Sequence, residues 1–430
     1  MAESLTFTTL GELIKDKRTE LGISISELSR RTGVSKGVIG YIESGETKRP
    51  ELRTLKSIAD VLKLSYEGVI ECYIEVERRI EILDGLLLEA IEISNNSLIS
   101  KVAQQIVESP HEDTYVILEH LYNLTGTVAD NESKLAIYSV IVKYARQHGV
   151  PKYIAKGLYQ KYLIERGDLK RLEESFKVGE EGLHYVDFLS DEEKIIFYFR
   201  MALHAHNIKK YPECIELCEA GISLEKSDTE LKARAYLAMI NSLSNLGDYS
   251  TVELHLDTFK KFNYNFVAEA TKLESAIVKA KKREFDVAIP LLNESLQEIS
   301  EHARIYVVNE LLEIYFELED MGAISKIFAE EERLFLNTNT PYKFSSLGRY
   351  YGYKGSYQVS IGLLEDGIDS YINSLKAYGE ISSYQEIVEC MNVILSNQPL
   401  HSKSTLLFEK LKKVYNGIID NKMIKKEWVQ

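Results

Sequence analysis

The sequence predicts an all-α protein with a small N-terminal helical domain followed by a long array of repeated helix pairs. Apolar residues recur at helical spacing along almost the whole chain, and no segment of note alternates as a strand does. Only 7 prolines interrupt 430 residues. Similar segments also return every 36 to 38 residues in the second half. These observations exclude a β-rich fold.

The first helix is predicted from about residue 10 to residue 21. Thr9 and Glu12 have the spacing of a capping box, in which each side chain binds the backbone N–H of the other residue. Leu10, Leu13, Ile14 and Arg18 then lie along one side. We therefore expect this helix to pack against the rest of the small domain.

Residues 21–49 predict two short helices joined by a tight turn. Ser24 and Glu27 have capping-box spacing at the start of the first helix, Gly33 ends it, and Ser35 caps the second. The expected inward positions are Ile25 and Leu28 in the first helix and Val38, Ile39 and Ile42 in the second. Two helices in this arrangement form a helix-turn-helix.

The second of these helices presents a candidate surface for reading DNA, because such a helix places its N-terminal residues in the major groove. Lys36 can donate to guanine or phosphate, and Tyr41 can hydrogen-bond or pack on a thymine methyl. The basic loop that follows suits phosphates. The residues predicted to contact DNA are Arg18, Ser24, Ser35, Lys36, Gly37, Gly40, Tyr41, Thr47, Lys48 and Arg49.

A fourth helix is predicted from about residue 50 to residue 64, and the helical pattern then continues from Ser65 towards Leu88. We interpret this continuation as a stiff linker helix. The expected organisation is a helix-turn-helix domain of five helices at 1–66, a linker helix at 67–90 and a repeat domain at 91–430.

Charge divides the chain in the same way. Residues 1–65 carry 11 Lys and Arg against 9 Asp and Glu, whereas the remaining residues carry 41 against 57. The net charge of −14 therefore comes from residues 66–430, and the N-terminal domain is compatible with DNA. Four scattered cysteines do not form a disulfide framework, and we expect Cys214 and Cys218 in the core.

The repeat domain is predicted from four segments that have the pattern of second helices in helical pairs. They lie at 209–224, 247–262, 283–299 and 321–335, and each follows a helix and a tight turn. Their spacing is close to the tetratricopeptide period, which predicts roughly eight or nine helical hairpins in a right-handed superhelix.

The N-terminal domain resembles a Cro/repressor-type (XRE) helix-turn-helix, on the motif GVSKGVIGYIESG and the following ETKRP. Ile25 departs from this family, which commonly has a Gln there. Together with tetratricopeptide repeats, the chain resembles the RRNPP peptide receptors, which include NprR-like, Rap, PlcR and arbitrium receptors. This resemblance implies a regulator of bacterial or phage quorum sensing that binds a short peptide inside its superhelix and changes its DNA binding in response.

The concave face of such a stack is lined by the first helix of each pair, so polar residues there are candidates for holding a peptide. Arg234, Asn241 and Asn245 form one stripe, and asparagine can both donate to and accept from a peptide backbone. Solvated polar positions are the alternative for each. The predicted peptide-binding residues are Arg200, His204, Asn207, Arg234, Asn241, Asn245, Lys279 and Asn309.

Motifs for other chemistry do not assemble, so the sequence predicts no enzyme, cofactor or metal site. The chain has no signal peptide and no apolar run of membrane length, which predicts a cytoplasmic protein without membrane contact. The expected partners are a palindromic double-stranded DNA operator, a peptide of about 5–10 residues and a second copy of the chain, contacted through residues 406–428. The alternative is a Rap-like module that sequesters or dephosphorylates a response-regulator protein.

Overall fold

In a computed structural model, the described residues are 9–109, 112–300, 303–329, 340–396, 411–414 and 416–417. They form helices and turns without any strand, which confirms the all-α prediction for this part of the chain. Contacts divide the chain into two compact units, Met1–Ile164 and Glu165–Gln430. No helix among the described residues combines the length and apolar character that crossing a bilayer requires.

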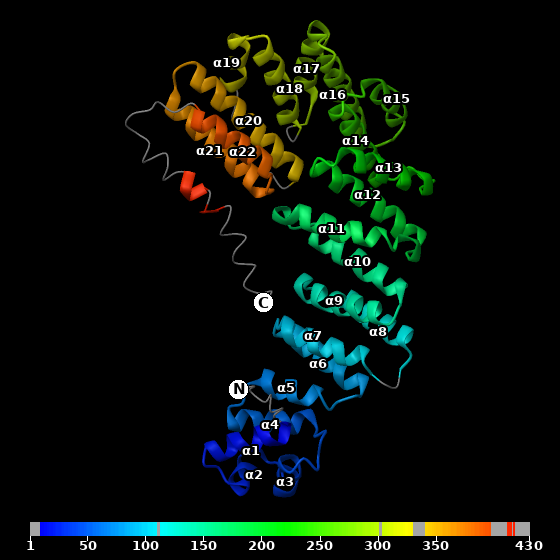
Figure 1. Ribbon diagram of the computed structural model, residues 1–430, viewed down its shortest axis with the longest axis vertical. Helices are drawn as coiled ribbons and strands as arrows, with labels where there is room; N and C mark the ends of the chain where they lie inside the picture. Colours follow the sequence, from blue (N-terminus) through cyan, green and yellow to red (C-terminus); the bar gives the residue numbers. More distant parts are fainter. Residues whose placement is uncertain are drawn as a thin grey trace, which may run out of the picture. The chain divides into compact units, whose positions relative to one another are not determined.

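The first unit begins with the five predicted helices (Figure 1). They are α1 (Leu10–Glu20), α2 (Ile25–Thr32), α3 (Lys36–Glu43), α4 (Leu52–Leu62) and α5 (Tyr66–Ile74). Thr9 and Glu12 form the predicted capping box, with N···O distances of 2.8 and 3.2 Å. Gly11 lets α1 approach α3 closely, because a side chain there would collide with the carbonyl oxygen of Ile42.

The prediction of one linker helix over residues 67–90 is wrong: α5 ends at Ile74, and five residues separate it from α6 (Ile80–Glu92). The cause is Glu77, whose side chain is fully buried. Its carboxylate accepts the backbone N–H groups of Arg78 and Arg79, both at 2.9 Å, and these donors are thereby lost to a continuing helix. The helical spacing of apolar residues does not reveal this break, because it continues through the turn between α5 and α6. We call this turn the corner. The domain boundaries expected at residues 66 and 90 lie within the first unit and stay a prediction.

The rest of the first unit is built from helices that pack against their neighbours. After α6 they are α7 (Asn96–Val107), α8 (Thr114–Thr127), α9 (Asn131–Gln147) and α10 (Pro151–Glu165). α6 packs on α7, and α9 packs on both α7 and α8. The apolar side chains between them are fully buried, which gives this part of the unit a core of its own.

The second unit consists mainly of consecutive helix pairs (Figure 1). The first helices are α12 (Asp191–Asn207), α14 (Glu230–Asn245), α16 (Asn265–Lys281), α18 (Arg304–Glu317) and α20 (Pro341–Ser360). The second helices are α13 (Tyr211–Leu224), α15 (Tyr249–Phe259), α17 (Phe285–Glu298), α19 (Met321–Ala329) and α21 (Leu364–Glu380). The short helices η1 (Leu169–Arg171) and η2 (Val186–Phe188) flank α11 (Leu172–Leu183), and α22 (Tyr384–Ser396) follows α21.

These pairs confirm the repeats that the sequence predicts, since α13, α15, α17 and α19 begin within a few residues of the expected positions. Cys214 and Cys218 are fully buried in α13, as expected. The second-copy contact predicted at residues 406–428 lies mostly outside the described residues.

Candidate functional site

Local sequence signals set where α2 and α3 begin and where α2 ends. The hydroxyl of Ser24 accepts the N–H of Glu27 at 3.1 Å, and that of Ser35 accepts the N–H of Val38 at 3.3 Å. Gly33 ends α2 with a left-handed φ of 73°, which a glycine adopts without strain. The capping-box prediction at Ser24 is only half right, because the Glu27 carboxylate pairs with Arg30 and Arg31 instead.

The outer face of α3 presents the residues that the sequence predicts there. Lys36, Gly37 and Tyr41 are exposed, and Tyr41 keeps 54% of its surface accessible. Val38, predicted to face inward, is 40% exposed, because only Ile39 and Ile42 of α3 are buried. The surface that α3 offers to a DNA groove is therefore more apolar than expected.

Arg18 does not belong to this surface. Its Nε and Nη2 donate to the two carboxylate oxygens of Glu43 at 2.6 and 2.7 Å, and its Nη1 donates to the carbonyl of Ile23 at 2.9 Å. Its side chain is 14% exposed. The predicted phosphate contact is thus wrong: this guanidinium ties α1 to α3, and its charge is neutralised inside the domain.

The loop after α3 keeps two exposed cations, Lys48 and Arg49, beside half-buried Thr47. Arg49 is also tied to the corner after α5, because its Nε donates to the carbonyl of Val76 at 2.6 Å. The loop that could contact phosphates is therefore attached to the connection between the five-helix domain and the next helices.

A groove of about 590 Å³ lies in the second unit, within the volume range of ligand sites. Residues of α12, α14, α16, α18 and α20 line it, together with the starts of α13 and α15. All five first helices of the pairs thus contribute, as the sequence predicts for a concave face.

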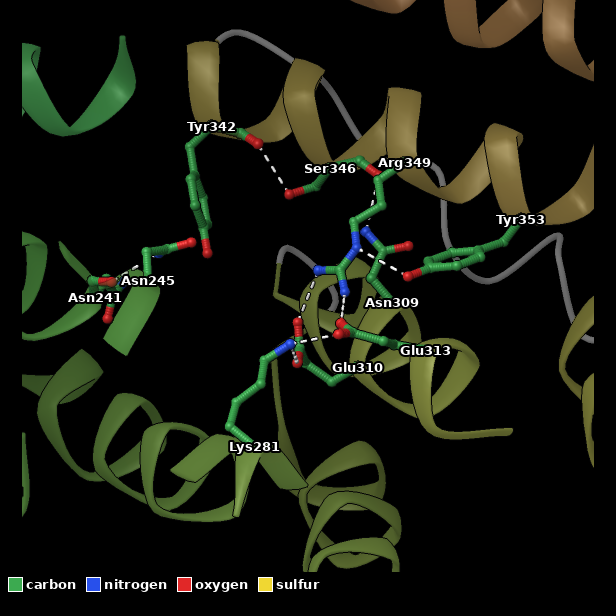
Figure 2. Close-up of polar contacts among 10 residues, drawn as sticks. All are labelled: Asn241, Asn245, Lys281, Asn309, Glu310, Glu313, Tyr342, Ser346, Arg349 and Tyr353. Atoms are coloured by element: carbon green, nitrogen blue, oxygen red, sulfur yellow. Dashed lines mark hydrogen bonds and ion pairs between the residues drawn. The ribbon is translucent and has the colours of Figure 1, made fainter. Parts of the chain in front are cut away.

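Three of the predicted peptide-binding residues line this groove: Asn207, Asn241 and Asn245. Asn245 is exposed and donates its amide to the carbonyl of Asn241 at 2.7 Å (Figure 2). When the side-chain amide of Asn241 is oriented to satisfy its neighbours, its nitrogen lies 3.0 and 3.3 Å from the two carboxyl oxygens of Glu274. Asn241 is therefore engaged within the groove before any ligand binds.

The other five predicted residues lie outside the groove: Arg200, His204, Arg234, Lys279 and Asn309. His204 is 2% exposed and packs edge-on against Phe176, and burial lowers its pKa to about 4. Arg234 pairs with Glu230 at 2.7 Å. The predicted stripes of polar residues therefore did not identify which side of each helix faces the groove.

Lys279 and Asn309 show the same error of helical phase. Lys279 pairs with Glu284 at 2.8 Å, and Asn309, 1% exposed, donates to the carbonyl of Ser346 at 2.8 Å. Their near neighbours Lys281 and Glu310 line the groove instead. Each residue step turns a helix by about 100°, so a shift of one or two positions separates a lining residue from a packing residue.

Sequence reasoning missed the wall formed by α20. Tyr342, Ser346, Arg349 and Tyr353 follow one another at helical spacing and line the groove (Figure 2). Tyr342 keeps 39% of its surface exposed. The spacing i, i+4, i+7, i+11 was visible in the sequence, and α20 would have been assigned as a first helix had its repeat been aligned with the others.

The helix-turn-helix region also matches known proteins in sequence. Residues 14–69 match the family model described as Helix-turn-helix. The chain is 26% identical to the HTH-type transcriptional repressor RghR of Bacillus subtilis (strain 168) over 135 residues, which are 29% of this chain and 96% of RghR. It is 32% identical to the HTH-type transcriptional regulator SinR of the same strain over 62 residues, 14% of this chain and 56% of SinR.

Three solved structures match the chain with weak overall superpositions. A Rap protein complexed with competence and sporulation factor matches with 11% identity and a TM-score of 0.37, covering 77% of this chain and 99% of that one. The corresponding values for phAimR are 12%, 0.39, 94% and 100%. Those for Bacillus thuringiensis PlcR in complex with the peptide PapR7 and DNA are 15%, 0.21, 63% and 99%. Residues 14–69 of this chain are therefore a helix-turn-helix domain, followed by an array of helix pairs.

Proposed function

We propose that the protein is a peptide-responsive DNA-binding transcription regulator of the RRNPP kind, acting in the cytoplasm. One observation carries the proposal: the chain that contains a helix-turn-helix domain also contains a polar groove of about 590 Å³ on the first helices of its repeats. A short peptide in this groove changes the affinity of the helix-turn-helix domain for DNA.

The groove has the chemistry that an extended peptide needs. A peptide without a strand partner must satisfy its backbone N–H and C=O groups, and the side-chain amides of Asn207, Asn241 and Asn245 can both donate and accept. Tyr342 adds an exposed aromatic surface for an apolar ligand side chain. We propose a ligand of about 5–10 residues for this groove.

The proposed DNA contacts are Lys36, Gly37, Gly40 and Tyr41 on or beside the exposed face of α3 and Thr47, Lys48 and Arg49 in the loop after it. Ser24 and Ser35 cap the N-termini of α2 and α3. The backbone N–H groups at these two helix starts can therefore be approached by a phosphate. One helix-turn-helix covers a half-site, and we therefore propose a homodimer on a palindromic operator.

The test starts with the full-length protein and a random double-stranded DNA library in low salt. We expect selection of one related set of sequences, bound with an affinity that falls steeply as salt rises. Tyr41→Ala should alter the selected sequence, whereas the control Tyr115→Ala, at a 51% exposed tyrosine of α8, should not. Selection of no sequence above background would overturn the regulator proposal and leave the Rap-like protein-interaction alternative.

The peptide half of the proposal has its own measurement. Synthetic peptides of about 5–10 random residues are titrated into the protein–DNA complex, and fluorescence anisotropy reports the DNA affinity. We expect at least one peptide of 5–10 residues to change that affinity by about tenfold, a coupling of about 1.4 kcal/mol. DNA affinities that do not change with any of these peptides would contradict the proposed response.

A further inference from the structure

Every charged side chain that lines the groove has an ion-pair partner among the described residues, except Glu274. α16, α18 and α20 bring three carboxyl groups and two cations together: Glu274, Glu310, Glu313, Lys281 and Arg349. Arg349 binds Glu310 at 2.8 Å and also contacts Glu313, while Lys281 binds Glu313 at 2.5 Å (Figure 2). These four residues neutralise one another, which leaves Glu274.

Glu274 forms no ion pair with any described residue, although its side chain is only 5% exposed and lines the groove. The side-chain amide of Asn241 lies 3.0 and 3.3 Å from its two carboxyl oxygens. An ionised carboxyl without a cation is costly in such a place. Burial, followed by the repulsion of Glu310, raises the pKa of Glu274 to about 8.

No cation of the groove is available to Glu274: Lys209, between α12 and α13, binds Glu386. On α16 and α20 the cations Lys281 and Arg349 are held by Glu310 and Glu313. On α12, burial lowers the pKa of His206 to about 4, so that this ring is neutral. α14 contributes the uncharged Asn241, and Tyr342 of α20 is a phenol with a raised pKa.

A purely structural role does not explain why a glutamate occupies position 274. On the same helix the apolar core takes Leu273 and Ala276, whereas Glu274 points into the groove beside Ile277 and Lys281. An apolar or amide side chain would fill this place without an unpaired charge. The carboxyl therefore has the features of one half of an ion pair whose other half arrives with a ligand.

We propose that Glu274 is the subsite for a positively charged group of the peptide, which displaces the amide of Asn241 from the carboxyl and frees that amide for the peptide backbone. This inference rests on the proposed function. The cation keeps Glu274 ionised in the complex, so peptide binding releases a proton whenever the free protein holds one. Affinity consequently rises with pH up to about 8 and is then constant.

The test uses the full-length protein and two libraries of N-acetylated hexapeptides. Each peptide carries one arginine, or in the second library one citrulline, among random uncharged residues. Citrulline keeps the shape of arginine without its charge. We expect the best arginine peptides to bind at least about tenfold more tightly than their citrulline counterparts. A third library with a free N-terminus and no arginine shows whether an α-amino group serves as the cation.

Calorimetry in two buffers of different ionisation enthalpy then counts protons. With the best arginine peptide at pH 7 we expect the wild-type protein to release close to one proton. In Glu274→Gln the release should vanish and the preference for arginine should fall to about twofold or less. The matched control is Glu294→Gln, at a 60% exposed glutamate of α17 outside the groove, and it should behave as wild type.

The possible failures are distinguishable. If peptides bind but arginine and citrulline are equal, or the preference survives in Glu274→Gln, this inference is overturned while the peptide-receptor proposal stands. If no peptide of any library binds, the proposed function itself fails. Proton release by the wild-type protein needs no variant, so the inference stays testable even if Glu274→Gln folds poorly.

Discussion

The corner between α5 and α6 offers the sharpest test of the physical reasoning, because one side chain holds it. We predict that Glu77→Gln loosens this corner. Glu77 accepts hydrogen bonds from the Tyr73 hydroxyl at 3.0 Å, from two backbone N–H groups and from the guanidinium of Arg79. Glutamine keeps the volume but removes the charge, and it turns an NH₂ group towards some of these donors.

The magnitude follows from burial and charge. Hydrogen bonds to charged groups contribute about 1.5–3 kcal/mol each, and removing one partner of a buried ion pair costs about 3–5 kcal/mol. Glu77 is fully buried, but the side chain of Arg79 is 53% exposed and regains water when the pair is broken. We therefore expect the lower end, a loss of about 3 kcal/mol in local stability.

Hydrogen exchange measures this loss where it occurs. The two units need not unfold together, so a single global unfolding curve is not the appropriate assay. A local loss of about 3 kcal/mol should speed exchange in peptides covering residues 73–83 by roughly 150-fold. The control is Glu75→Gln, the same substitution at an exposed glutamate two positions away, which should change exchange by about twofold or less. Equal exchange in the two variants would refute the reasoning.

The same carboxyl predicts a pH dependence. Burial alone would raise the pKa of Glu77, but the hydrogen bonds from Arg79, Arg78 and Tyr73 outweigh it and lower the pKa to about 2. A lowered pKa stabilises the folded state above the unfolded-state value and loses that contribution as the pH falls towards 2. Protection of residues 73–83 should therefore weaken in acid in the wild-type protein and much less in Glu77→Gln.

Four further outcomes are expected. Lys48→Ala should weaken binding to all DNA sequences alike and reduce the slope of log affinity against log salt by about 0.9 in anisotropy titrations. Gly348→Ala should lower the local stability of α20 by about 1–3 kcal/mol in hydrogen exchange, because the added Cβ would lie 2.6 Å from an aromatic ring of α21, whereas Gly352→Ala, whose nearest neighbour is 3.9 Å away, should raise it by up to about 1 kcal/mol. Asn241→Ala should weaken peptide binding by roughly 5- to 150-fold in calorimetry without altering peptide-free DNA affinity. Because the pKa of Glu274 is raised to about 8, the local stability of α16 should fall as pH rises from 4.5 to 8, and Glu274→Gln should remove that fall in hydrogen exchange corrected for the intrinsic effect of pH.

The helix-turn-helix could be predicted well because its signals are local. A serine cap, a glycine in the left-handed region and a short apolar pattern each act within one turn of helix, and all were readable from the sequence. Val38 was misplaced because an eight-residue helix has too few apolar positions to fix its phase. Arg18 was misplaced because its partner, Glu43, lies 25 residues away.

The groove was predicted in kind but not in detail. The repeat period identifies which helices line it, and three asparagines were found in this way. The Glu274–Asn241 contact and the network around Arg349 join helices that are far apart in sequence, so their geometry depends on how the pairs stack. The spacing of apolar residues along one sequence contains no information on that stacking. From this spacing alone, a buried acid such as Glu274 is predicted to lie on a solvated helix face.

Arg49 connects the loop after α3, which we propose to contact DNA, with the corner between α5 and α6. Its Nε is held by the carbonyl of Val76, the residue before Glu77, which leaves both Nη groups of the guanidinium for a phosphate. An arginine can thus bind DNA and the corner at once, whereas the ammonium of Lys48 acts as a point charge. Removing Arg49 would mix two effects, loss of a phosphate contact and release of the loop from the corner. Because Arg49 Nε donates to the carbonyl of Val76, we expect a change in the corner to reach the Arg49 loop through this hydrogen bond, and with it the proposed DNA contact.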